Sequence, residues 1–233
     1  GQQFTLINND GSDAVTGTFL NQPEGSPISY AGGGTLYVSY AGNDGNDVVL
    51  YSQPTVNGGA GADALVLRQV SGNPVLVEFS LNAATFVQVT STLPFLYNGN
   101  LGTDLLLVDT SNGDPISTGN TTFNGELLRV QKNTGAASDA VTYVPTSTVG
   151  TGAVNHATFG TINFTQMTNV DFVNMLTANI QTATANDTLT IAGGNTATNG
   201  AAVPAGYSTA AAAELSVGGA NAIVGLRTVT NSN

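Results

Sequence analysis

The sequence predicts an all-β fold with very little helix, and three observations support this prediction. Short runs rich in Val, Thr, Leu and aromatic residues, all strand formers, recur along the 233 residues. Gly, Asn and Asp, which favour turns, separate these runs. Part of the pattern also repeats at a fixed offset. Together these features favour a β-solenoid, a stack of repeats like a β-helix, with a β-sandwich as the alternative.

The expected strands are runs of four to six residues that end at turn formers. In chain order they are residues 35–40, 48–51, 64–67, 75–79, 85–90, 105–108, 126–130, 140–144, 161–165 and 188–191. The two ends of the chain, residues 1–7 and 222–229, have the same composition. A helical turn is expected only at residues 208–215, where an Ala-rich run follows Ser208, a suitable N-cap.

The repeat appears when the chain is aligned with itself at an offset of 41 residues. Three separate segments then match: residues 61–67 with 102–108, residues 72–75 with 113–116, and residues 86–89 with 127–130. A unit of strand, turn and strand cannot bury its apolar side alone, whereas stacked units form a continuous core. We therefore expect one elongated domain over residues 1–233, with a sub-boundary near 145–155.

Composition excludes several classes of function. The net charge is −11, from 15 acidic and 4 basic residues, so the chain cannot neutralise a nucleic-acid backbone or be attracted to an anionic membrane. No apolar run of about 18 residues is present, so no membrane insertion is expected. With no Cys and one His, the usual ligands of zinc, iron–sulfur and haem sites are missing.

Three turns carry a pattern that suits calcium. Residues 58–66 match G-G-x-G-x-D-x-U-x, and residues 42–50 and 99–107 match it except at the second position. Glycines allow positive φ and aim carbonyl oxygens inward, while Asp supplies a carboxylate for a hard cation. The chain here resembles RTX-type repeats, which implies Ca²⁺ in the turns of a parallel β-roll. The candidate ligands are Asp44, Asp47, Asp63 and Asp104.

A second interpretation of the same Asp residues needs no ion. In the RTX family each ion is shared between consecutive nonapeptides, whereas residues 52–55 interrupt the two neighbouring units here. An Asp carboxylate can instead cap a corner of the stack by accepting backbone N–H groups. Calcium and corner capping both remain open from the sequence.

A further resemblance concerns the setting of the protein. Residues 8–19, 23–25 and 38–50 resemble the module of large secreted bacterial proteins with autotransporter-associated β-strand repeats. Residues 160–164, 170–173 and 186–191 are similar to another rung of those proteins. The resemblance implies a repeat-built surface or passenger protein, secreted or at the cell surface, with no enzyme activity and no catalytic residues.

An enzyme is the main competing class. A β-helical carbohydrate-active enzyme needs clustered carboxylates with a nearby base. Candidate acids are Asp109, Asp114 and Glu126, close in sequence to Arg129 and Lys132, but nothing in the sequence indicates that they converge. The single histidine, His156, is expected in a surface loop. The prediction is therefore that the chain is not an enzyme.

The ends of a strand stack expose unpaired backbone, which needs caps or partners. The terminal segments supply apolar strands for such pairing, with the candidate interface residues Phe4, Leu6, Ile7, Ile223, Val224 and Leu226. Partners would be further copies of the chain or adjacent repeats of a longer one. The predicted function is an extracellular, self-associating structural module of a surface layer, fibre or adhesin stalk. The alternatives are a calcium-stabilised module that binds glycans or surfaces, and the β-helical enzyme.

Overall fold

A computed structural model gives the structure of the chain. It describes residues 2–43, 46–91, 93–116, 120–132, 134, 139–146, 148, 150–156, 160–181, 188–192, 207, 213–218 and 223–227. For residues 188–192, 213–218 and 223–227 only the backbone is described.

The described residues form strands and connecting turns, with no helix among them. All ten strands and both terminal strands expected from the sequence are present, so the all-β prediction is confirmed. The strands are β1 (Gln3–Ile7), β2 (Pro27–Tyr30), β3 (Gly34–Gly42), β4 (Asp47–Tyr51), β5 (Thr55–Asn57), β6 (Ala64–Val70), β7 (Asn73–Leu81), β8 (Val87–Thr90), β9 (Phe95–Asn98), β10 (Leu105–Asp109), β11 (Thr121–Asn124), β12 (Leu127–Gln131), β13 (Ala140–Pro145), β14 (Gly152–His156), β15 (Thr161–Thr165), β16 (Asn169–Val173), β17 (Thr177–Ile180), β18 (Thr188–Ala192), β19 (Ala213–Gly218) and β20 (Ile223–Arg227).

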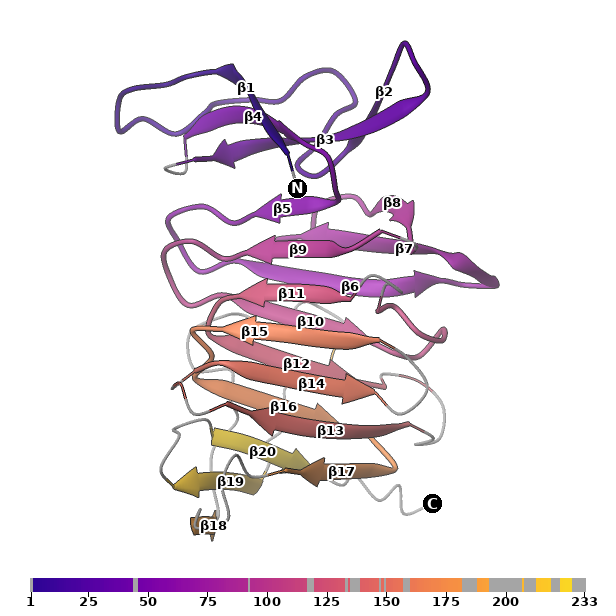
Figure 1. The fold of residues 1–233 in the computed structure, drawn as a ribbon, viewed down its shortest axis with the longest axis vertical. Helices are drawn as coiled ribbons and strands as arrows, with labels where there is room; N and C mark the ends of the chain where they lie inside the picture. The colour runs from indigo at the N-terminus through magenta and orange to yellow at the C-terminus, as the bar shows by residue number, and fades with distance from the viewer. Residues whose placement is uncertain are drawn as a thin grey trace.

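These strands make three sheets (Figure 1). A four-stranded antiparallel sheet in the order β1-β4-β3-β2 lies at one end of the molecule. Below it, two larger sheets lie along the long axis. The first, sheet C, has the order β17-β13-β14-β15-β11-β9-β5. The second, sheet D, has the order β18-β19-β20-β16-β12-β10-β6-β7-β8.

From β9 to β12 the chain alternates between sheets C and D, and the strands that stack in each sheet run parallel. Strand β6 pairs with β10 and β5 with β9, each at an offset of 41 residues, so that Leu65 lies opposite Leu106 and Val56 opposite Tyr97. The first segment of the sequence repeat therefore corresponds to real strand neighbours. The alignment of residues 86–89 with 127–130 does not: β8 pairs with β7, because the two form a meander with β6 at the end of sheet D.

The main core lies between sheets C and D. Sheet D contributes aliphatic side chains such as Leu106 and Val130, and sheet C contributes several aromatic ones. The rings of Tyr97 and Phe123 stack with centroids 5.2 Å apart, at an angle of 8°. Parallel strands in register place like side chains one above another, so such stacking follows from the strand pairing.

The outer face of sheet D is also apolar and buried. Ala64, Val66, Leu105, Leu107 and Leu127 form a second cluster, against which Phe86 and Tyr207 pack. Both faces of β10 and β12 are buried, and residues 105–108 of β10 accordingly form a continuous apolar run in the sequence rather than an alternating one.

The four-stranded sheet is tied to the larger sheets. Tyr37 of β3 belongs to the main core. The Glu24 carboxylate accepts the N–H of Tyr40 in β3 at 2.8 Å and the N–H of Asn57 in β5 at 3.0 Å. Through these two hydrogen bonds Glu24 joins the four-stranded sheet to sheet C. The carboxyl is buried, and burial raises its pKa to about 7.

The helical turn expected at residues 208–215 is wrong where the structure describes it. Ala213, Glu214 and Leu215 lie in β19, which pairs with β18 on one side and β20 on the other; residues 208–212 lie outside the described part. Pairing with two strands outweighs the helix propensity of the Ala-rich run. Within the described residues, no helix is long and apolar enough to cross a membrane.

Candidate functional site

The corners that lead from sheet C into sheet D contain a ladder of acidic side chains. Asp63, Asp104 and Glu126 each stand just before a strand of sheet D. The Asp63 N–H donates to Asp104 Oδ1 at 2.8 Å, and the Asp104 N–H donates to Glu126 Oε2 at 2.9 Å. The carboxylates of Asp104 and Glu126 therefore cap the backbone of the corner stacked against each, while that of Asp63 caps its own corner by accepting the N–H of Gly59 at 2.6 Å. This is the capping role considered from the sequence.

A second ladder, of amide side chains, ends the strands of sheet C. Asn98 Nδ2 donates to Asn57 Oδ1 at 2.8 Å, and Asn124 Nδ2 donates to Asn98 Oδ1 at 2.7 Å. The Thr165 hydroxyl then donates to Asn124 Oδ1 at 2.7 Å. Sequence reasoning missed this ladder, although its signal is present: each of the three Asn residues is followed by Gly.

Those glycines allow the corners to stack closely. A Cβ on Gly58 would lie 2.5 Å from the carbonyl oxygen of Gly99, and a Cβ on Gly99 would lie within contact of the Asp104 carboxylate. None of Gly58, Gly59 and Gly61 has a left-handed φ, contrary to the expectation from the nonapeptide pattern. At Gly58 and Gly99 the missing side chain is needed for close approach rather than for backbone conformation.

One carboxyl of the ladder is incompletely satisfied. Asp104 is 1% exposed, and its Oδ2 is buried without a hydrogen-bond partner. Burial raises the pKa of Asp104 to about 7, with smaller contributions from the charges of Glu126 and Asp63. Burial and the same three carboxylates also raise the pKa of Tyr97, whose hydroxyl is likewise buried and unpaired. The corner thus holds a carboxyl that gains a proton readily.

The four predicted calcium ligands do not form one group. Asp63 and Asp104 are neighbours in the ladder, whereas Asp47 is in the four-stranded sheet and accepts the N–H of Asn9 at 2.7 Å. Asp44 lies outside the described residues. In the part of the chain that the structure describes, no three His, Asp or Glu side chains are placed to hold a metal ion. Calcium binding stays a prediction.

The candidate acids of an enzyme lie at different corners. Glu126 binds the Asp104 amide at the start of β10, whereas Asp109 ends that strand, about 17 Å away for five extended residues. Arg129 is 1% exposed and paired with Asp171, its Nη2 lying 2.7 Å from Asp171 Oδ2.

The only lysine and the only histidine meet at the far corner. Lys132 Nζ lies 3.7 Å from Asp139 Oδ2, and His156 Nε2 lies 3.9 Å from Asp139 Oδ1. The charge of Asp139 adds to the effect of burial in raising the pKa of Asp114 to about 6. His156 belongs to β14 and is 4% exposed, so its expected place in a surface loop is wrong. Burial lowers its pKa.

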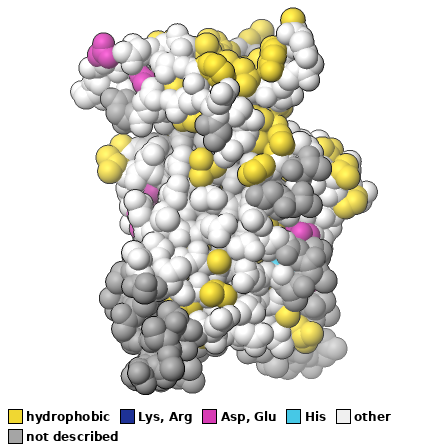
Figure 2. Space-filling model, in the orientation of Figure 1, with side chains coloured by type: hydrophobic (Ala, Val, Ile, Leu, Met, Phe, Trp, Pro, Cys, Tyr) yellow, Lys and Arg dark blue, Asp and Glu magenta, His cyan; other side chains and the backbone are white. Residues whose placement is uncertain are grey.

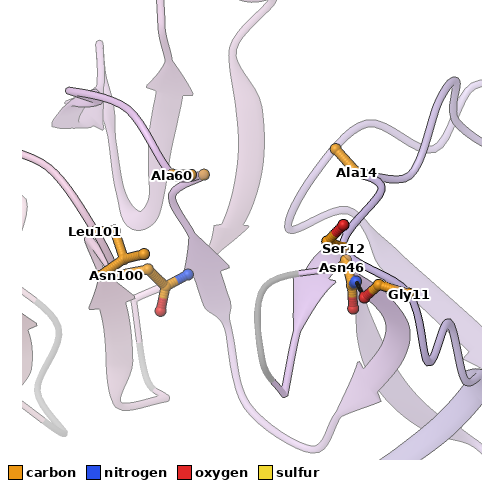
Figure 3. A pocket seen from close by; sticks show the side chains of 8 residues that line it. Gly11, Ser12, Ala14, Asn46, Ala60, Asn100 and Leu101 are labelled. Carbon is orange, nitrogen blue, oxygen red and sulfur yellow. Dashed lines mark hydrogen bonds between the residues drawn. The ribbon is translucent and has the colours of Figure 1, made fainter.

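A cleft of about 390 Å³ lies beside the acidic ladder, between the loop that follows β1 and two corners of the larger sheets (Figure 3). Asn46 Nδ2 donates to the carbonyl of Gly11 at 2.5 Å, while its Oδ1 is buried without a partner. Among the described residues, the lining contains no charged and no aromatic side chain, and so no stacking platform of the kind typical of glycan sites. The lining residues are Gly11, Ser12, Ala14, Asn46, Gly59, Ala60, Asn100 and Leu101.

The N-terminal part of the described chain, which contains the four-stranded sheet, has most of the exposed large hydrophobic side chains. Figure 2 shows hydrophobic side chains gathered over this sheet, at the top of the view. Phe4, Leu6 and Ile7 of β1 are each about half exposed. Six of the nine exposed large hydrophobic side chains belong to residues 1–30: Phe4, Leu6, Ile7, Phe19, Leu20 and Tyr30.

Strand β1 also has an open backbone edge. It pairs only with β4 among the described strands. The Ser52 N–H donates to the carbonyl of Gln2, and since backbone groups alternate along a strand, those of Gln3 and Thr5 point away from β4. The opposite terminal strand differs: β20, with Ile223, Val224 and Leu226, already pairs with β16 and β19 and offers no open edge.

Comparison of this chain with protein-family models, with curated proteins and with solved structures finds no match.

Proposed function

We propose that the chain is a non-enzymatic, extracellular structural module, a β-solenoid that associates with further copies of itself into a layer, fibre or stalk. The observation that supports this proposal most directly is the open edge of β1. It combines unpaired backbone groups with half-exposed Phe4, Leu6 and Ile7. Such an edge is a template for another strand.

The charge distribution supports the same proposal. Copies with a net charge of −11 repel one another, so they can meet only where charge is absent. Residues 1–9 contain no charged side chain, and neither do strands β2 and β3 of the same sheet. Copies that associate through this uncharged part of the N-terminal sheet therefore avoid placing acidic side chains against one another.

The solenoid part of the proposal rests on the ladders. Parallel strands in sheets C and D carry continuous rows of Asn, acidic and aromatic side chains from one strand to the next. Rows of this kind are what a repeat stack requires, because each unit is satisfied by its neighbours. A rigid stack of this kind would serve as a spacer or building block rather than as a flexible linker.

The test uses Thr5→Pro, which removes an N–H that points away from β4 and leaves the pairing with β4 intact. The matched control, Thr5→Val, keeps the N–H and the strand propensity. We expect ordered assemblies of the wild type and of Thr5→Val in negative-stain electron microscopy, and single particles of Thr5→Pro. Deletion of residues 1–7 should act like Thr5→Pro while circular dichroism retains the β signal.

The same experiment in CaCl₂ and in EDTA examines the calcium proposal. Loss of assemblies in EDTA would favour Ca²⁺ at the Asp corners, whereas equal assembly in both favours capping by hydrogen bonds. Monodisperse wild-type particles in both conditions would contradict the proposed self-association.

A further inference from the structure

The far end of the molecule presents a second open edge. Strand β17 is the last strand of sheet C and pairs only with β13 among the described strands. The N–H groups of Thr177 and Gln181 donate to carbonyls of the Asp139–Tyr143 segment. By alternation, the backbone groups of Ala178 and Ile180 point away from β13, toward the open side.

This edge suits an uncharged, apolar strand. Residues 172–186 contain no charged side chain, and Leu176, which precedes β17, is 63% exposed. Strand β1 is similarly uncharged and apolar, and the two strands have five and four residues. Two acidic copies could therefore join these edges without bringing like charges face to face.

The position of the two edges determines the symmetry of the assembly. Figure 1 places β1 and β17 at opposite ends of the long axis. Pairing of β1 with another β1 would close a two-fold dimer, whereas pairing of β1 with β17 leaves a free edge at each end of the dimer. Only the second mode continues indefinitely along one axis.

We propose that the open edge of β17 receives β1 of the next copy, so that the chain assembles head to tail. This inference rests on the proposed self-association and adds its second surface. The occupant is a further copy of this chain, and the product is an open-ended fibre.

The absence of cysteine from the sequence allows a direct test. Thr5→Cys chains are mixed with Asn179→Cys chains, the position opposite Thr5 in a parallel pairing, or with Ala178→Cys chains, the position opposite it in an antiparallel pairing, under mild oxidation. We expect mixed disulfide dimers about tenfold in excess over either homodimer, because a disulfide forms only where Cα atoms come within about 7 Å. Thr5→Cys homodimers in excess would overturn the inference and leave self-association through β1 standing.

A second variant separates failure of this inference from failure of the proposed function. Ala178→Pro removes an outward N–H of β17 without touching the bonds to β13, and Ala178→Ser keeps that N–H. In electron microscopy we expect fibres of Ala178→Ser and single particles of Ala178→Pro. Fibres of Ala178→Pro that disappear in Thr5→Pro would overturn the role of β17 alone. Single particles of the wild type would overturn both proposals.

Discussion

At the scale of single residues, the buried carboxyls make stability depend on pH in an unusual direction. Burial raises the pKa of Asp104 to about 7, above its ordinary value of 3.8. A raised pKa means that the folded protein holds the proton more tightly than the unfolded chain. The stabilisation is therefore complete below about pH 4 and is lost as the pH rises through about 7. Glu24 and Asp114, whose pKa values are raised to about 7 and about 6, act in the same direction.

The expected result is a thermal unfolding midpoint that falls between about pH 4 and about pH 7, measured by circular dichroism. Asp104→Asn should flatten this fall, because an amide stays neutral and its oxygen still accepts the Asp63 N–H. Asp13→Asn, at an exposed position, is the control and should leave the slope unchanged. An unchanged slope in Asp104→Asn would mean that Asp104 does not hold its proton in the folded state.

At the scale of elements, strands β12 and β16 are joined by a buried ion pair. Arg129 and Asp171 lie directly opposite each other in the strand register, and both side chains are about 2–3% exposed. Removing one partner leaves the other charge buried, so Arg129→Met should cost about 3–5 kcal/mol of unfolding free energy. The double variant Arg129→Met with Asp171→Leu should recover most of that loss in urea denaturation. Equal losses of unfolding free energy in the single and double variants would show that lost packing, not the unpaired buried charge of Asp171, causes the destabilisation.

Strands were predictable from the sequence to the extent that their signal is local. The composition of runs such as residues 105–108 predicts strands, and the 41-residue offset correctly pairs β6 with β10. The same offset fails for residues 86–89, because strand β8 resembles a repeat locally but extends the sheet as part of an inserted meander. The helical turn expected at 208–215 fails in its described part, residues 213–215, for the converse reason, since strand neighbours override local preference there.

The candidate site shows the same limit at long range. The contact of Asp63 with Asp104 has the 41-residue spacing of the repeat and could be predicted from it. The contact of Asp104 with Glu126 has a spacing of 22 residues, which the repeat does not predict. The burial of His156 depends on how β14 packs in sheet C, which its neighbours in sequence do not indicate.

At the scale of the whole molecule, the charge of −11 opposes the proposed assembly at every distance that salt does not screen. The screening length falls from about 30 Å at 0.01 M salt to about 8 Å at 0.15 M. Fibres should therefore form at a lower protein concentration, and faster, as NaCl is raised over this range, followed by light scattering. Asp10 and Asp13 lie in the exposed loop that follows β1.

Neutralising both in Asp10→Asn with Asp13→Asn should weaken the salt dependence, because these exposed charges follow β1 directly in the chain. Assembly that weakens as salt rises would show that attraction between opposite charges holds the copies together. The uncharged edges of β1 and β17 could not then be the contact, since neither strand carries a charge for salt to screen.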